Sequence, residues 1–232
     1  MTRQIVIAID GPAASGKSST AQWVAQRLGF CHVDSGALYR AATAARLRDT
    51  GGHNPEDWTE ADVLGAARRR VALVPKNNLF VPQLDGAFAD EELRGSQVTQ
   101  HVSRVAKMQG VRAWVDEQVR ETAERKPVVV DGRDIGTTVF PDADLKVFLV
   151  ADPWERARRR LVQQLQRSPS DQEIAEETDR LVQRDARDAR QSGQAPDAVL
   201  LDTTYLTQEE QVDRIVALAR AVTQRGEGTS VD

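Results

Sequence analysis

The sequence predicts an α/β fold of three layers, in which helices cover both faces of a central parallel sheet. Residues 5–9 and 128–130 are uninterrupted apolar runs, and residues 145–150 and 198–202 are further strand candidates. Strands that are buried on both faces of a parallel sheet have this continuous apolar character. Long stretches with helical spacing of apolar residues separate the runs, and this alternation favours a parallel sheet.

The first strand leads directly into Gly11-Pro-Ala-Ala-Ser-Gly-Lys-Ser18, which matches the GxxxxGK[ST] pattern of a phosphate-binding loop. A helix is expected over residues 19–28, with Gly29 as its stop signal. The glycines let backbone N–H groups curl around an anion, and the helix N-terminus adds the positive end of its dipole. We therefore expect a nucleoside triphosphate here, with Lys17 on the β- and γ-phosphates and the Ser18 hydroxyl on Mg²⁺. The predicted nucleotide-binding residues are Gly11, Pro12, Ala13, Ala14, Ser15, Gly16, Lys17, Ser18 and Ser19.

Composition limits the classes of protein that fit. The 232 residues are enough for one large domain, and the net charge of −4 offers no basic field for nucleic acid. The single cysteine, Cys31, excludes an internal disulfide and suits a reducing compartment. No apolar run approaches the roughly 20 residues of a membrane helix, and no signal-peptide pattern opens the sequence. We expect a soluble, cytoplasmic protein.

The segment after the first helix predicts a strand over residues 30–33, a turn at 34–36 and a helix to residue 46. Ser35 opens this helix where N–H groups are free, and Arg40 lies about one turn further along. The pair suits a phosphate, because a guanidinium forks onto two of its oxygens. On the local pattern alone, a serine N-cap followed by a solvated arginine is the better interpretation.

In the central part of the chain, the spacing of apolar residues changes twice between that of a helix and that of a strand. A loop is expected at residues 51–55, followed by a helix to residue 70 that Asp57 or Thr59 caps. Short apolar runs at 71–74, 79–81 and 87–88 then predict a small antiparallel meander, a candidate inserted subdomain. Residues 98–126 return to helical spacing, with a break expected at Gly110.

The strand at 128–130 runs into Asp131-Gly-Arg-Asp-Ile-Gly136. Ligands of open α/β sheets bind beyond the carboxyl ends of the strands, so Asp131, Arg133 and Asp134 are expected beside the phosphate loop. A carboxylate at the end of an apolar strand also suits a position near Mg²⁺.

Residues 153–190 predict a helical hairpin that is unusually rich in arginine. Guanidinium groups on a mobile flap suit a transferring phosphoryl group, whose charge spreads over several oxygens. We assign this role to Arg156, Arg159 and Arg160 as a set. After the strand at 198–202, Thr207 with Glu210 forms a capping box for the last helix, and residues 226–232 are expected to be a frayed tail.

Four segments together resemble the bacterial cytidylate kinase family. They are Ile-Asp-Gly-Pro-Ala-Ala-Ser-Gly-Lys-Ser-Ser (9–19), Asp-Ser-Gly-Ala-Leu-Tyr-Arg (34–40), Asp-Gly-Arg-Asp-Ile-Gly-Thr-Thr-Val-Phe-Pro-Asp-Ala (131–143) and Arg-Asp-x-x-Asp (184–188). The resemblance implies a P-loop kinase that transfers the γ-phosphoryl group of ATP to CMP or dCMP, with Mg²⁺. It also implies three regions in one domain: a core (about 1–34, 127–152 and 196–225), a monophosphate-binding region (about 35–126) and a lid (about 153–192).

The resemblance assigns the site residues position by position. It implies Ser35, Arg40 and Arg133 on the acceptor phosphate, Ser103, Arg112 and Asp134 on the base, and Arg184 with Asp188 on the ribose. The catalytic set is Lys17, Arg133, Arg159, Arg160 and Arg184. Asp134 fits this role chemically, since a carboxylate accepts from the N4 amino group of cytosine. We expect a monomer whose partners are nucleotides, without nucleic acid or membrane.

The sequence departs from the family pattern at one place. Gln191 stands where many members have an arginine, and the Pro-Leu stretch that usually follows is missing. Arg187 or Arg190 can replace the missing cation. Two other functions stay open at this point: a kinase of another acceptor, such as shikimate or dephospho-coenzyme A, which the Asp-Gly-Arg-Asp segment disfavours, and a nucleotide-dependent switch, which the paired arginine sites disfavour. The sequence has no Asn-Lys-x-Asp segment for reading guanine, which disfavours a GTPase.

Overall fold

The computed structural model describes residues 4–49, 55–188 and 193–227, which contain one eight-stranded sheet. Its order is β3-β4-β2-β6-β1-β7-β8, with β5 paired to β4. The strands from β4 to β8 along this order run parallel, whereas β3 and β5 are antiparallel to β4. The strands are β1 (Val6–Asp10), β2 (Cys31–Asp34), β3 (Val71–Lys76), β4 (Leu79–Leu84), β5 (Ala87–Phe88), β6 (Val128–Asp131), β7 (Leu145–Val150) and β8 (Val199–Asp202).

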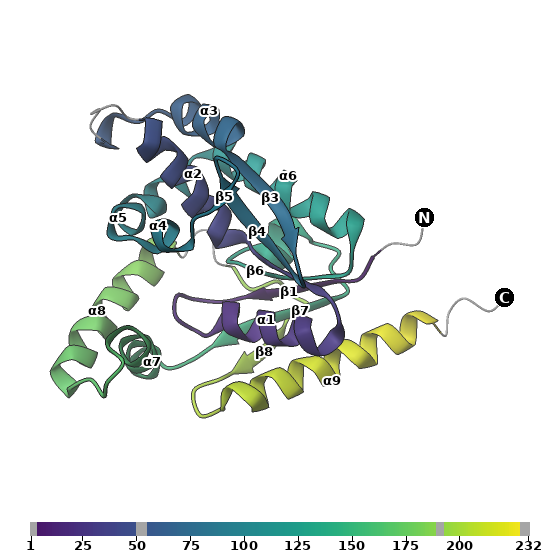
Figure 1. Cartoon of the computed structure of the whole chain (residues 1–232). Coiled ribbons are helices and arrows are strands. Elements are labelled where there is room, and N and C mark those ends of the chain that lie inside the picture. Colours follow the sequence, from purple (N-terminus) through teal and green to yellow (C-terminus); the bar gives the residue numbers. More distant parts are fainter. Residues whose placement is uncertain (1–3, 50–54, 189–192, 228–232) are drawn as a thin grey trace.

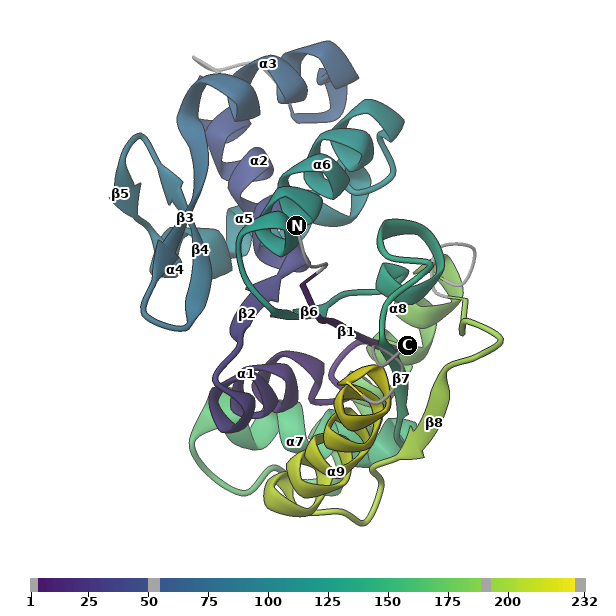
Figure 2. The same ribbon diagram turned by 90° about the vertical axis from the view of Figure 1, so that its right-hand side faces the viewer.

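Helices cover both faces of this sheet, as the sequence predicts (Figures 1 and 2). On one face lie α1 (Lys17–Leu28) and α9 (Gln208–Glu227), and on the other α2 (Ser35–Asp49), α3 (Glu60–Arg70) and α6 (Gln109–Arg125). The side chains of β1 point alternately to the two faces of the sheet and pack in the core of each face. Val6 and Ala8 are buried against the α2, α3 and α6 side, and Ile7 and Ile9 against α1 and α9. The fold is therefore the predicted three-layer α/β/α arrangement.

The antiparallel meander forms where it is predicted, but it extends the central sheet. Its strand β4 pairs in parallel with β2, with His32 opposite Leu79 and Val33 opposite Phe80. The helices α4 (Asp90–Arg94) and α5 (Ser96–Val105) follow the meander and lead back to α6. The segment thereby delivers α4 and α5 to the end of the sheet where α2 begins.

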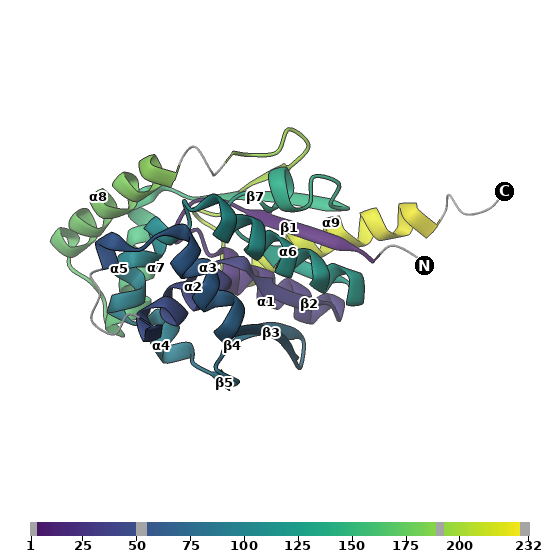
Figure 3. The same cartoon turned by 90° about the horizontal axis from the view of Figure 1, so that it is seen from above.

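A helical hairpin of α7 (Pro153–Leu165) and α8 (Asp171–Asp188) projects from one end of the molecule (Figures 1 and 3). Asp152 caps α7, because its side chain accepts hydrogen bonds from the N–H groups of Trp154 and Glu155. Two short turns complete the described chain: a 3₁₀ turn at Pro55–Asp57 and a π-helical turn at Ile135–Val139. None of the described helices is long and apolar enough to cross a membrane.

Several boundaries differ from the sequence expectation, and the structure decides between the two expected caps of α3. No turn separates β2 from α2, because the Asp34 carboxylate accepts the Ala37 N–H and starts the helix at once. The break between α5 and α6 lies at residues 106–108, and Gly110 is in α6, where the Glu60 side chain leaves no room for a Cβ. Thr59, rather than Asp57, caps α3. The last helix α9 continues to Glu227, past the expected start of the tail. The predicted loop at 51–55 lies mostly outside the described residues, as do Gln191 and Arg190.

Gly11 provides a test of how tightly the phosphate loop is tied to the sheet. Its φ is 149°, and a Cβ there would overlap the carbonyl oxygen of Leu149 in β7. We expect Gly11→Ala to lower the free energy of unfolding by ~1–3 kcal/mol through overpacking. Because the displaced backbone is that of the phosphate loop, ATP affinity should fall as well.

Gly29→Ala is the matched control for Gly11→Ala. Gly29 has φ 71° at the end of α1, with open space around it. Its replacement should cost ~1–2 kcal/mol of backbone strain and leave ATP affinity unchanged. Denaturant unfolding and ATP titration measure the two effects. Equal ATP affinity in both variants would contradict the role given to Gly11.

Candidate active site

One cleft of about 1330 Å³ lies beyond the carboxyl ends of β1, β2 and β6. It brings together most of the sequence-predicted site residues: Ala13, Ala14, Ser15, Gly16, Lys17, Ser18, Ser19, Ser35, Arg40, Ser103, Arg112, Arg133, Asp134, Arg159, Arg160 and Arg184. Gly11 and Pro12 are not among its lining residues. The side chain of Asp188 lies outside the described residues.

The phosphate loop occupies the centre of the cleft. Ala14 and Gly16 have positive φ angles of 57° and 85°, and α1 begins directly after them. The Lys17 ammonium donates to the Pro12 carbonyl at 2.6 Å, which curls the side chain back over the loop. Burial, and then the nearby positive charge of Arg133, lower the pKa of Lys17 from 10.5 to about 8. The Lys17 ammonium thus lies in surroundings that disfavour its charge.

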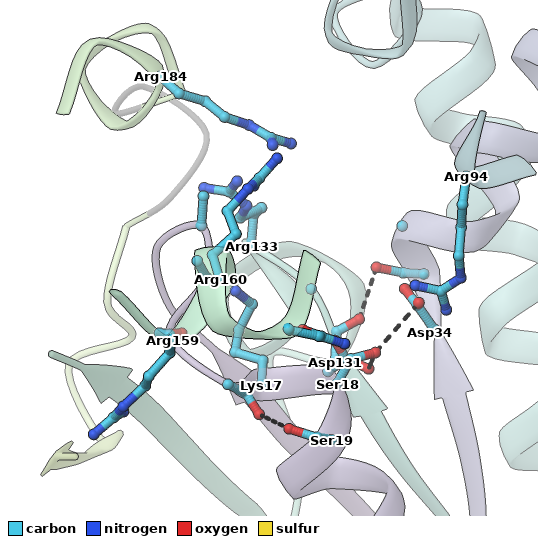
Figure 4. A pocket seen from close by; sticks show the side chains of 18 of the residues that line it. Lys17, Ser18, Ser19, Asp34, Arg94, Asp131, Arg133, Arg159, Arg160 and Arg184 are labelled. Carbon is cyan, nitrogen blue, oxygen red and sulfur yellow. Dashed lines mark hydrogen bonds between the residues drawn. The ribbon is translucent and has the colours of Figure 1, made fainter. Parts of the chain in front are cut away.

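Two carboxylates face the Ser18 hydroxyl. Ser18 Oγ lies 3.3 Å from Asp34 Oδ2 and 3.3 Å from Asp131 Oδ1 (Figure 4). Burial, and then the negative charge of Asp131, raise the pKa of Asp34. His32 Nε2 lies 2.7 Å from Asp131 Oδ1 and fixes that carboxylate from the side of β2. This set of oxygens is of the kind that Mg²⁺ prefers.

No group of three or more His, Cys, Asp or Glu residues that could enclose a metal occurs in the part of the chain that the structure describes. Asp34 was not predicted as a site residue. Its signal in the sequence is its position at the end of a short strand, directly before Ser35.

Asp10 holds the segment after β6 in place. Its carboxylate accepts hydrogen bonds from the N–H groups of Ile135 at 2.9 Å and Gly136 at 2.7 Å. Burial raises the pKa of Asp10 to about 6, although the two N–H groups lower it. This contact between β1 and the π-helical turn positions Arg133 and Asp134 beside the phosphate loop.

One end of the cleft carries an ion pair between α6 and the segment that follows β6. Arg112 on α6 pairs with Asp134, and its guanidinium lies over the Tyr39 ring, 5.9 Å from the centroid. A further N–H of Arg112 donates to the Ala106 carbonyl at 3.2 Å. Burial raises the pKa of Asp134, while the charge of Arg112 lowers it. Ser103 lines the same end of the cleft.

Cations gather between this end and the phosphate loop. Arg40 donates to the Leu93 carbonyl at 3.2 Å and to Thr99 Oγ1 at 3.1 Å, which aims its guanidinium along the cleft. Figure 4 shows Arg94 directed from α4 toward Asp34. Burial, and then the charges of Arg94 and of Arg160 on α7, lower the pKa of Arg40. Cations that repel one another across a cleft indicate a site for an anion.

Ser35 and Arg94 modify the sequence-based account of this region. The Ser35 hydroxyl donates to the Asp131 carbonyl at 2.9 Å and so joins the start of α2 to β6. Arg94 was not predicted, because nothing in its local sequence separates it from a solvated arginine. Its position in the cleft depends on how the meander returns α4 to the sheet.

The lid arginines differ in where they point. Arg159 donates to the carbonyls of Thr203 and Thr204 at 2.7 and 2.8 Å, and Figure 4 shows it directed away from Lys17. Arg156 is buried and does not line the cleft. Arg160 of α7, which pairs with Glu177 at 3.0 Å, and Arg184 of α8 line the cleft on the side of the helical hairpin. Of the predicted set, Arg159 and Arg160 therefore line the cleft, although backbone carbonyls engage the Arg159 guanidinium, and Arg156 is buried outside the lining.

This fold and this site define a class. A phosphate loop at the centre of one cleft faces a second cationic site that contains the Arg112–Asp134 ion pair, and an arginine-rich helical hairpin stands beside both. Such an arrangement belongs to a P-loop kinase that brings ATP and a small phosphorylated acceptor together.

Comparison with known proteins identifies the family. The family model described as "Cytidylate kinase" matches residues 7–221. The cytidylate kinase of Chloroherpeton thalassium is 41% identical over 230 residues, which covers 96% of each chain. That of Geobacillus kaustophilus is 42% identical over 224 residues, covering 94% of this chain and 97% of the relative. The chain belongs to the cytidylate kinase family.

Solved structures give more distant matches. A shikimate kinase from Bacteroides thetaiotaomicron aligns with a TM-score of 0.48 at 15% identity, covering 93% of this chain and 98% of that chain. The family membership makes the chain an ATP-dependent nucleoside monophosphate kinase, a phosphotransferase with nucleotide substrates.

The lowered pKa of Lys17 predicts how the enzyme responds to pH. The ammonium is charged below about pH 8 and loses its proton above it. We expect kcat/KM for ATP to be level below that pH and to fall about tenfold per pH unit above it, since this ratio reports the free enzyme. In kcat, the fall in activity should begin at a higher pH, because bound phosphates raise the pKa of Lys17. In Lys17→Arg this fall should be absent; its survival in this variant would assign it to another group.

Proposed function

We propose that this enzyme transfers the γ-phosphoryl group of ATP–Mg²⁺ to CMP, and to dCMP as a second acceptor, giving CDP or dCDP and ADP. The observation that carries the proposal is the position of the Arg112–Asp134 pair in the same cleft as Lys17 and Ser18. A base reader, an acceptor-phosphate site and a donor loop in one cleft are what direct transfer between two nucleotides needs.

The donor end would hold ATP through the phosphate loop. Lys17 would contact the β- and γ-phosphates, and Ser18 would ligate Mg²⁺. The carboxylates of Asp34 and Asp131 are close enough to the Ser18 hydroxyl to accept from water molecules on that ion. When bound, Mg²⁺ supplies neutralisation of the charge that develops on the phosphate oxygens.

The acceptor phosphate would lie among Arg40, Arg94 and Arg133, with the start of α2 at Ser35 beneath it. The mutual repulsion of Arg40, Arg94 and Arg160 supports this placement, since a phosphate between them relieves it. The N-terminus of α2 adds its dipole.

The base would be read by Asp134, Arg112 and Ser103. Asp134 accepts from the N4 amino group of cytosine, and the two other side chains donate to N3 and O2. Uracil would place its O4 against the carboxylate, and two buried acceptors facing each other are unfavourable. Arg184 with Asp188 would contact the ribose hydroxyls, so the enzyme distinguishes CMP from dCMP by degree only.

The transfer would proceed in line and without a covalent enzyme intermediate. An oxygen of the acceptor phosphate attacks the γ-phosphorus while the bond to the β–γ bridging oxygen breaks. Lys17, Arg133 and Arg160 stabilise the charge on the transferring group, and closure of α7 and α8 over the cleft excludes water. The chain would work as a monomer in the cytoplasm.

Lys17→Ala tests the donor role of the loop. We expect kcat to fall by about 10²–10³-fold, since one preformed donor to a developing negative charge is removed. The dissociation constant for CMP should stay within about twofold, because Arg40 and Arg133 remain. Steady-state assay and calorimetric titration of CMP measure the two quantities. An equal loss of CMP affinity would remove Lys17 from the donor site.

Asp134→Asn tests the base reader. Asparagine replaces one of the two acceptor oxygens with an NH₂ group. That group can donate to O4 of uracil, but it cannot accept from the N4 amino group of cytosine. An unpaired buried polar group costs ~1–3 kcal/mol, so the preference for CMP over UMP in kcat/KM should fall about 10- to 100-fold. Asp116→Asn is the control and should keep the preference for CMP. Asp116 lies on α6, one turn after Arg112, and is close enough to Asp134 for their charges to interact. Unchanged selectivity in Asp134→Asn would exclude this residue as the reader.

A further inference from the structure

The tip of the phosphate loop belongs to the hydrophobic core of the lid. Ala13 is buried in a cluster with Ala157 and Leu161 of α7 and with Ile174 and Leu181 of α8, and Ala14 packs against it. No strand of the central sheet contributes to this cluster as far as the described residues go. The loop that receives ATP is therefore packed on the hairpin that covers it.

Polar contacts join the same two parts. Asp185 of α8 accepts the Ala13 N–H at 3.2 Å through Oδ1 and an N–H of Arg156 at 2.7 Å through Oδ2. Arg156 of α7 also donates to the Ala13 carbonyl at 2.7 Å. Both backbone polar groups of Ala13 are thus engaged by side chains of the lid.

Arg156 is nearly inaccessible to solvent, with 4% of its surface exposed. Its Nε donates to the Ala151 carbonyl at 3.1 Å, at the end of β7. A guanidinium in this environment requires a partner charge, since an uncompensated buried charge is strongly unfavourable. Asp185 supplies that charge. The ion pair consequently fixes α8, α7, the end of β7 and the phosphate loop relative to one another.

This contact also bears on the strain in the loop. Ala14, the next residue, has φ 57°, a left-handed conformation that a residue with a Cβ adopts only when its surroundings impose it. Holding Ala13 by both its N–H and its carbonyl constrains the backbone immediately before that position.

We propose that Asp185 and Arg156 are positioning residues, which hold the phosphate loop in its ATP-binding conformation and set its distance to the lid arginines. This inference rests on the proposed kinase function and adds two residues to it. Arg184 directly precedes Asp185 on α8, and Arg160 follows Arg156 by one turn of α7. The contact therefore fixes the positions of Arg160 and Arg184 relative to Lys17. Asp185 is the first aspartate of Arg-Asp-x-x-Asp. The proposed substrate contacts assign it no role, and this contact with Ala13 and Arg156 gives it one.

Asp185→Asn is the direct test, because it keeps the shape and one acceptor oxygen but removes the charge that faces Arg156. A displacement of about 1 Å at a reacting centre costs about 10²-fold, so kcat/KM for ATP should fall by about that factor. KM for CMP should change by less than about twofold, since Asp185 touches none of the acceptor site. Asp185→Glu keeps the charge and should recover part of the loss.

Asp179→Asn is the matched control. Asp179 is exposed on the same helix, and its replacement should leave all kinetic constants at the wild-type values. Steady-state kinetics with ATP and CMP varied separately, together with circular dichroism, provide the measurements. Wild-type protein and the control must form CDP; if neither does, the kinase proposal fails rather than this one.

Three outcomes would overturn the positioning role. One is an Asp185→Asn enzyme with the constants of the control. Another is an equal rise of KM for ATP and for CMP, as a general loosening of the fold produces. The third is a chain that does not fold, which would make Asp185 a requirement for folding rather than a positioning residue.

Discussion

Three neighbouring strands that each end in an aspartate determine where this enzyme does its chemistry. β2, β6 and β1 are adjacent and parallel, and Asp34, Asp131 and Asp10 stand at their carboxyl ends. The sheet register places Asp34 opposite Asp131. Two of the carboxylates face Ser18, and the third holds the backbone that carries Arg133 and Asp134. Both halves of the cleft depend on the carboxyl ends of these three strands.

Several charged groups of the cleft lie in surroundings that disfavour their charge. Burial and neighbouring cations lower the pKa of Lys17 and Arg40, while burial and a neighbouring carboxylate raise that of Asp34. Phosphates and a divalent cation would reverse each of these shifts. The charges are thus arranged for the nucleotides rather than for the stability of the free enzyme.

Much of the fold and part of the site could be predicted from the sequence. The strands, the phosphate loop and the Thr207 cap follow from local patterns, and they form where expected. Arg94 and Asp185 could not be recognised, because their positions depend on how the meander and the hairpin return to the sheet. The contacts of Arg159 were equally out of reach: adjacent residues on a helix point about 100° apart, and only the folded structure shows that the carbonyls of Thr203 and Thr204 engage Arg159.

The most direct test of the account is ADP release with ATP–Mg²⁺ and each of CMP, dCMP, UMP, AMP and GMP. A site that pairs Asp134 with N4 of cytosine predicts the strongest signal with CMP, a lesser one with dCMP and little with the other three. A comparable signal with UMP would contradict the base-reading role of Asp134 and Arg112. The absence of any signal that depends on a nucleoside monophosphate would contradict the kinase function itself.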